Sequence, residues 1–326
     1  MGDMKLILLI LGAVLLIIGA AVAYGRLKKK GIDITSITKI STVTNTYFVD
    51  APFAAIAADD AAFSVRILPS EDRICRVKCK GSKKLYHVVT IESDTLIIRR
   101  EDKRKWYDRF GLQLEGAEIV MLLPVGQYRS LRVATPCGRI EVAKPFTFND
   151  VELSSADGSI AFEAMVEERL LIQTASSDVY VSESGPRTMN IQTRSGSVTV
   201  DAIRSETNLN INTTSGDITL ADIRCRKAVA ETSGGKITFT DLVASVKIRI
   251  RSAAGDVELS ECDAESLKIK TVAGDVTGTL LSQKEFVCKT TAGEIEVPEG
   301  STGGLCKIKT VSGDVSIKID YSKIFR

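Results

Sequence analysis

The sequence predicts an all-β protein in which a short repeat winds coil upon coil into a single-stranded parallel β-helix, or solenoid. Three observations favour this fold. A small turn residue recurs every 19 or 20 residues from Gly138 to Gly313. Apolar and polar residues alternate on both sides of each turn residue, which is the period of a strand with one buried face. Aromatic residues make up only 6% of the 326-residue chain, and Val, Ile, Thr, Ser and Gly are frequent, as in β structure with tight turns.

The N-terminal segment carries an uncharged apolar run, Leu6–Ala23, whose 18 residues fit a transmembrane helix. A cleaved signal peptide is the alternative, because residues 21–23 (Ala-Val-Ala) have the small-x-small form of a cleavage site. Basic residues follow the run at Arg26 and at positions 28–30, and the positive-inside rule would keep the rest of the chain in the cytoplasm. We therefore predict a single-pass membrane anchor with a basic flank in residues 1–30.

An irregular β region is predicted for residues 31–130, ahead of the repeats. Alternating residues indicate strands at 64–69, 74–79 and 119–123, and a hairpin formed by 87–91 and 95–99. The stretch 99–110 mixes basic and acidic residues around Trp106 and Tyr107. Its mixed charges favour an exposed loop, although basic residues beside aromatic ones also occur at membrane interfaces and nucleic-acid sites.

The repeats fill residues 131–326. In the coil around Gly216, apolar residues stand at positions −7, −5, +2 and +4 from the turn, as Leu209, Ile211, Ile218 and Leu220. Two such strands cannot bury their apolar faces alone, but equivalent strands of successive coils can pair in parallel. We therefore expect about ten coils of 19–20 residues, in a rod roughly 50 Å long at about 4.8 Å per coil.

The turn itself has a fixed chemistry. Position −3 is Thr or Ser in every coil, and we interpret this row as hydroxyls that bond the turn backbone. The Gly is expected to supply a positive φ. Position +1 is acidic in six coils: Asp178, Asp217, Asp256, Asp275, Glu294 and Asp314. Stacked carboxylates could hold Ca²⁺, but Asp beside Gly is ordinary turn chemistry, so no metal site is predicted.

The outward positions −6 and −4 change character along the rod. Early coils carry amides such as Asn210 and Asn212, whereas the last four coils carry cations: Arg249, Arg251, Lys268, Lys270, Lys289, Lys307 and Lys309. Like charges on neighbouring strands repel. These side chains therefore either fan apart in solvent, or form a stripe for a polyanion such as a phosphate-bearing envelope polymer or lipid headgroups.

The residues of enzyme active sites are scarce in this chain. Its single His, His87, lies in the irregular region, so no Ser-His-Asp arrangement on the repeats is possible. Cys75 and Cys79 could share a metal, but no second pair completes a site. The seven Cys are odd in number and scattered, which argues against a disulfide framework. A net charge of +2 gives no global field for nucleic acid. We predict a non-enzyme without a cofactor.

The repeated motifs TTSGDITL, ETSGGKITF, SAAGDVEL and TVSGDVSI, preceded by SVRILPSED and IVMLLPVGQYRSLRVAT, carry a resemblance. Over about residues 45–320 the chain resembles the bacterial "putative adhesin" family of β-strand-repeat proteins, a domain of unknown function. The resemblance implies a right-handed single-stranded β-helix, often membrane-tethered and linked to the cell envelope in some members. It supplies no catalytic residues.

Together these observations predict a membrane-anchored β-solenoid that serves as a binding or adhesion-like module with a polymer, lipid headgroup or protein partner. The resemblance favours the extracytoplasmic side, and the basic flank favours the cytoplasm. The alternative is a cytoplasmic-face scaffold that associates end to end, because only seven residues follow the strand of the last coil at 315–319 and leave an open parallel edge. A carbohydrate-active enzyme is the weaker third hypothesis.

Overall fold

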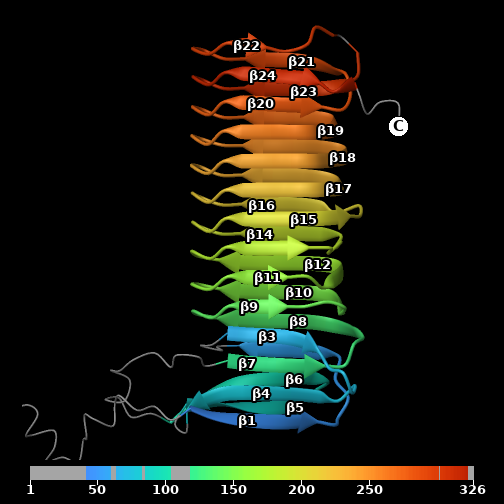
Figure 1. Cartoon of the computed structure of the whole chain (residues 1–326), viewed down its shortest axis with the longest axis vertical. Helices are drawn as coiled ribbons and strands as arrows, with labels where there is room; N and C mark the ends of the chain where they lie inside the picture. The colour runs from blue at the N-terminus through green and yellow to red at the C-terminus, as the bar shows by residue number, and fades with distance from the viewer. Residues whose placement is uncertain (1–41, 60–63, 83–84, 104–117, 301, 322–326) are drawn as a thin grey trace, which may run out of the picture.

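The protein is a straight rod of stacked β-strands (Figure 1). The computed structural model describes residues 42–59, 64–82, 85–103, 118–300 and 302–321. Every secondary-structure element of two or more residues in this part of the chain is a β-strand. This confirms the predicted all-β solenoid. The winding amounts to about nine turns, since ten turn residues bound nine repeats. The apolar run Leu6–Ala23 and most of the stretch 99–110 lie outside the described residues, and the right-handed winding stays an expectation.

The central stack follows chain order. Its strands are β8 (Gln127–Thr135), β9 (Ile140–Val142), β10 (Thr147–Ser155), β11 (Ile160–Phe162), β12 (Met165–Thr174), β13 (Val179–Ser182), β14 (Thr188–Gln192), β15 (Val198–Arg204), β16 (Asn208–Asn212), β17 (Ile218–Glu231), β18 (Ile237–Arg251), β19 (Val257–Lys270) and β20 (Val276–Leu280). Equivalent strands pair in parallel, and Leu209 is opposite Ala228 in the next coil. Register shifts occur in the pairings of β10 with β12, β17 with β18, β18 with β19, and β19 with β20. The longest strands, β17 to β19, turn a corner and supply both walls of the rod.

The core is a continuous column of the predicted inward residues. Leu209, Ile211, Ile218 and Leu220 are all buried, and so are most of their equivalents from coil to coil. The apolar exceptions lie in the top coil, where Phe286 and Cys288 are half-buried and Ile295 is exposed. This agreement confirms the period-2 reading of the repeat, in which every second residue of each strand points inward.

The expected positive φ of the turn glycines is wrong. Among the described residues, only Gly278 and Gly303 are glycines with positive φ. Glycine is required at the turn for a different reason, because a Cβ on Gly216 would overlap the carbonyl oxygen of Gly196 in the coil beneath. In five coils a left-handed residue instead stands six positions later, at the opposite corner: Glu183, Ala202, Asp222, Asp241 and Glu261, with φ between 49° and 55°.

The base of the rod is closed by antiparallel strands. It comprises β1 (Thr42–Val49), β2 (Ala55–Asp59), β3 (Ser64–Pro69), β4 (Cys75–Ser82), β5 (Leu85–Glu92), β6 (Thr95–Asp102) and β7 (Glu118–Leu123). The expected hairpin is β5 and β6. β2 pairs in parallel with β8, and β3 with β9, so the stack continues below residue 131. Below them, β4 runs antiparallel to β7 and β1 antiparallel to β4 (Figure 1). The domain boundary predicted at residue 130 therefore stays a prediction, which rests on the point where the sequence repeats begin.

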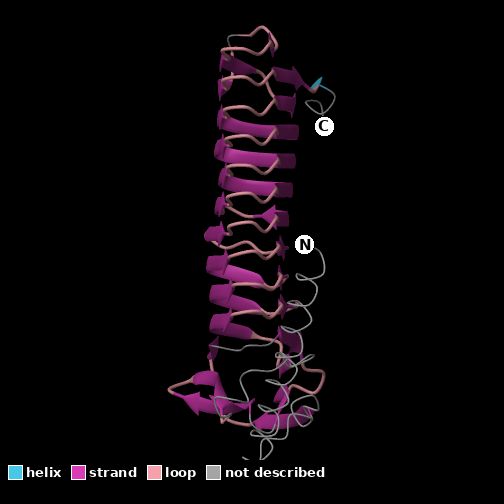
Figure 2. Cartoon of the chain, turned by 90° about the vertical axis from the view of Figure 1, so that its left-hand side faces the viewer, coloured by secondary structure: helices cyan, strands magenta, loops and turns pink. Residues whose placement is uncertain are grey.

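The top of the rod departs from chain order. Its strands are β21 (Lys284–Lys289), β22 (Ile295–Glu296), β23 (Gly304–Lys309) and β24 (Val315–Ile319). β23 pairs with β19 and β24 with β20, while β21 and β22 stack on the outside of β23 and β24. The last coil in sequence is thus inserted beneath the coil that precedes it (Figure 1). Figure 2 shows the same stack of strands turned by 90° about its long axis. The expectation that strand 315–319 forms the open edge is wrong, because β21 and β22 occupy that place.

Candidate anion-binding surface

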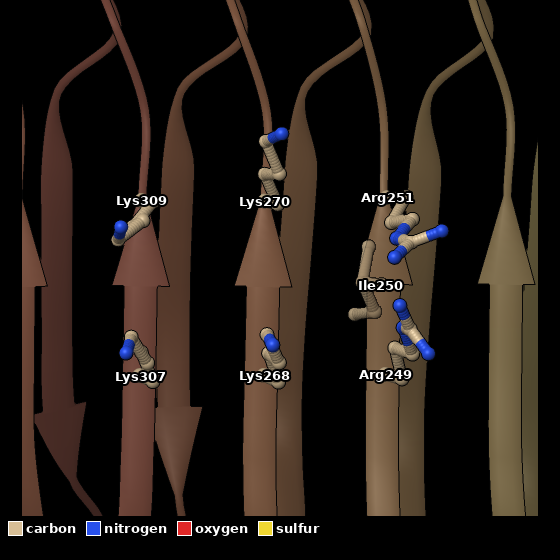
Figure 3. A pocket seen from close by; sticks show the side chains of 7 residues that line it. All are labelled: Arg249, Ile250, Arg251, Lys268, Lys270, Lys307 and Lys309. Atoms are coloured by element: carbon tan, nitrogen blue, oxygen red, sulfur yellow. The ribbon is translucent and has the colours of Figure 1, made fainter.

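The seven predicted cations lie on the outer faces of four consecutive strands, β18, β19, β23 and β21. Along the rod, Arg249 is opposite Lys268, which in turn is opposite Lys307. A second column runs beside it from Arg251 through Lys270 and Lys309 to Lys289. Figure 3 shows the first three members of each column projecting from one wall. We call these seven residues the cationic stripe.

The inserted coil makes the first column continuous. In chain order Val287 would stand between Lys268 and Lys307. The insertion instead places Lys307 directly opposite Lys268 and moves Val287 outward. Neighbouring strands are about 4.8 Å apart, so each column repeats a cation at that interval. Strand pairing holds the spacing rigidly, which the sequence alone did not predict.

Elsewhere on the rod, cations of one coil tend to face acids of the next. Arg204 pairs with Asp222 at 2.6 Å and Arg224 contacts Asp241 at 2.8 Å. Within the stripe the single ion pair between described residues joins Arg251 to Glu231, at 3.2 Å on the side facing the base. Two unit charges about 4 Å apart in water repel by about 1 kcal/mol. The stripe thus concentrates like charges that acids do not offset.

A hollow opens between the two columns. It measures about 270 Å³, and its lining comprises Arg249, Arg251, Lys268, Lys270, Lys307 and Lys309 with Ile250. A second hollow of about 480 Å³ adjoins it and shares Arg251 and Lys270. The half-buried Arg249 keeps its Nε out of solvent with no hydrogen-bond partner in the described part of the chain. An anion seated here would meet several cations at once.

The other repeated polar residues serve the coils themselves. In eight of the ten turns the Thr or Ser hydroxyl at −3 accepts the N–H of the turn residue, as Thr213 does from Gly216 at 3.1 Å. Five of the six acidic residues at +1, all of them Asp, accept a backbone N–H from the adjacent coil, as Asp217 does from Lys236 at 2.8 Å. These bonds confirm that both rows are turn chemistry. The amides form a short ladder of their own, with Asn210 donating to Asn190 at 3.4 Å.

Five of the seven cysteines are buried, and burial keeps their thiols protonated. Burial raises the pKa of Cys75 to about 11 and that of Cys79 to about 12, so neither is a thiolate near neutral pH. Burial likewise raises the pKa of Cys225, Cys262 and Cys306 to about 12. His87 is buried on β5, away from the repeats. No metal-suited cluster of His, Cys, Asp or Glu occurs in the residues described.

Within the same residues there is no helix long and apolar enough to cross a membrane.

Fold and surface together define a class: an elongated all-β repeat protein that offers flat side walls, one of them cationic. The chain belongs to the Toastrack DUF4097 family, which matches it over residues 53–229 and 203–325. This assignment agrees with the resemblance carried by the repeat motifs.

The chain is also similar to solved structures of proteins from several bacteria. A "putative adhesin" from Bacteroides fragilis is 12% identical, with a TM-score of 0.43 over 85% of this chain and 97% of its own. One from Parabacteroides distasonis is 12% identical, with a TM-score of 0.43 over 86% and 98%. A "putative lipid binding protein" from P. distasonis is 16% identical, with a TM-score of 0.35 over 84% and 96%. Comparison with curated proteins finds no match. Function must therefore be argued from the chain's own residues.

Proposed function

We propose that the protein is a non-catalytic, membrane-anchored binding module whose cationic stripe holds phosphate-bearing anions, from an envelope polymer or from lipid headgroups. The observation that carries this proposal is the pair of cation columns with a single acidic partner, Glu231, at one edge. The net charge of the chain is only +2, so the stripe is a local concentration of positive charge and not part of a strong overall field. A polyanion or a charged surface could engage both columns at once.

The rigidity of the wall supports the same function. Six of the seven cations stand on β18, β19 or β23, each of which pairs with a strand on both sides, so a ligand does not have to order the backbone there on binding. The two Arg at the lower edge add planar guanidinium groups, which match phosphate oxygens better than an ammonium does. The lining of the hollow comes from three neighbouring strands, β18, β19 and β23, which suits an anionic partner that extends along the rod.

Charge reversal of two neighbouring cations tests the proposal. We expect Lys270→Glu with Lys309→Glu to weaken binding of the full chain to phosphatidylglycerol vesicles or to soluble polyphosphate by about tenfold or more, since each basic residue near an anionic surface is worth about 1 kcal/mol. The matched control is Lys78→Glu with Lys80→Glu, an equal charge change on exposed residues of β4. Co-sedimentation and a competition assay provide the affinities, with phosphatidylcholine vesicles as the neutral reference.

The two anion sources separate in this assay. Binding to vesicles alone identifies lipid headgroups, and binding to polyphosphate alone identifies a polymer. Equal losses in the stripe variant and the β4 control, or no binding of either anion by the unaltered chain, would contradict the proposal.

The side of the membrane is a separate part of the proposal. We place the rod outside the cytoplasm on the strength of the family resemblance, against the basic flank at residues 26–30. Val311 is 48% exposed near the top of the rod. A Val311→Cys chain in a Cys137→Ser background should react with a membrane-impermeant maleimide in intact cells. Reaction only after lysis would put the rod in the cytoplasm.

A further inference from the structure

The top of the rod is an open sheet edge, in contrast to the base. In the described structure β21 pairs with β23, and β22 with β24, on the inner side only. No antiparallel layer like that of β1 and β4 lies above them (Figure 1). Val287 on β21 and Ile295 on β22 are each 43% exposed. Unpaired strand edges with exposed apolar residues are surfaces on which another strand can add.

The backbone of β21 shows which groups await a partner. The Thr310 N–H donates to the Lys289 carbonyl oxygen at 3.0 Å, so Lys289 directs its backbone groups toward β23. Glu285 and Val287 share that orientation because the direction alternates along a parallel strand. Phe286 and Cys288 therefore direct their N–H and C=O groups outward, away from β23. An added strand must hydrogen-bond to these two residues.

We propose that the partner is a second copy of this chain, whose β21 pairs antiparallel to the first about a twofold axis at Val287. Phe286 and Cys288 of one copy then exchange backbone hydrogen bonds with Cys288 and Phe286 of the second copy. The two Val287 side chains meet on the axis. Glu285 faces Lys289 of the second copy, and this ion pair forms twice.

Charge complementarity selects this register. A twofold axis at Phe286 would place Glu285 opposite Val287 of the second copy, and an axis at Cys288 would place Lys289 opposite Val287. Both alternatives leave the charged residues without opposite charges across the junction. Only the axis at Val287 joins acid to base, and cross-strand pairs of opposite charge stabilise antiparallel pairing.

The symmetry has consequences for the assembly. An interface of this kind uses the same surface on both copies, so it closes after two and does not grow into a filament. The axis runs perpendicular to the wall that carries β21. The cationic stripes of both copies therefore lie on the same face of a rod of double length, and a long anion could engage both. The dimer does not depend on that ligand.

Cysteine cross-linking tests the axis. Opposed residues in a non-hydrogen-bonded antiparallel pair have Cα atoms about 4.5 Å apart, within the range that a disulfide spans. In a Cys137→Ser background, Val287→Cys should form an intermolecular disulfide in membranes of cells that express the full chain. Leu305→Cys, which is 41% exposed on β23, should not. Absence of the Val287 cross-link, or an equal yield from Leu305, would overturn the proposal.

A charge swap tests the register by mass. The full chain in detergent should be a concentration-dependent dimer by light scattering. Lys289→Glu should shift it to monomer by placing Glu opposite Glu, and adding Glu285→Lys should restore the dimer because each ion pair reforms with its signs exchanged. These residues are exposed, so the rod stays folded. A monomer at all concentrations, or a double variant that remains monomeric, would contradict the arrangement.

Discussion

At the residue scale, the turn is set by how closely successive coils approach. The period of the turn residues is visible in the sequence, as is the hydroxyl at −3, because both repeat at 19–20 residues. The reason for glycine was not predictable, since the same residue satisfies a positive φ and a close backbone approach. In the structure a Cβ on Gly235 would overlap the Gly216 carbonyl oxygen, whereas a Cβ on Gly234 would meet nothing within 4 Å.

The two adjacent glycines provide a matched test. Gly235→Ala should lower the free energy of unfolding by about 1–3 kcal/mol, because the overlap forces two coils apart. Gly234→Ala should leave it within about 0.5 kcal/mol or raise it, because the site is open and alanine restricts the unfolded chain. Urea denaturation of both variants measures the difference. Equal stability of the two variants would show that stacking does not require glycine here.

At the scale of the element, the insertion of the last coil is the feature that sequence periodicity does not predict. The coils share one apolar pattern, so this pattern alone does not specify the order in which the last two coils stack. The distinguishing signals are local. Lys284 reaches Asp263 of β19 at 2.5 Å and is 4% exposed. A Cβ on Gly304 would overlap the Glu265 carbonyl oxygen, so glycine lets β23 enter beside β19. These two contacts occur once and do not recur from coil to coil, so the sequence repeat could not predict them.

Disulfide formation between exposed positions can verify the order of the coils. Lys268 and Lys307 are opposed on adjacent parallel strands, about 4.8 Å apart, so Lys268→Cys with Lys307→Cys should form an intramolecular disulfide. Lys268→Cys with Val287→Cys should not, because β23 separates them and the Cα atoms are about 9.6 Å apart. Peptide mapping by mass identifies each bond. A disulfide between positions 268 and 287 but not between 268 and 307 would show that the coils stack in chain order and would contradict the insertion.

At the scale of the whole molecule, the insertion turns separate cations into a continuous surface. The seven residues of the stripe could be predicted from the sequence, because outward positions follow from the repeat. Their neighbours could not, because the contact of Lys268 with Lys307 depends on the order of the coils. The hollow of about 270 Å³ and the buried Nε of Arg249 are likewise products of three-dimensional stacking. The sequence thus identifies which residues form the stripe, and the stacking order of the coils determines which of them are neighbours.

The most direct test of the account is the salt dependence of anion binding. The logarithm of the binding constant for polyphosphate or phosphatidylglycerol vesicles should fall linearly with the logarithm of salt concentration, as counterions are released. Lys268→Ala and Lys307→Ala should each reduce the slope by about one if each cation pairs with one anionic group, while Lys78→Ala leaves the slope unchanged. Slopes identical in all three variants and in the unaltered chain would show that the cationic stripe is not the binding surface.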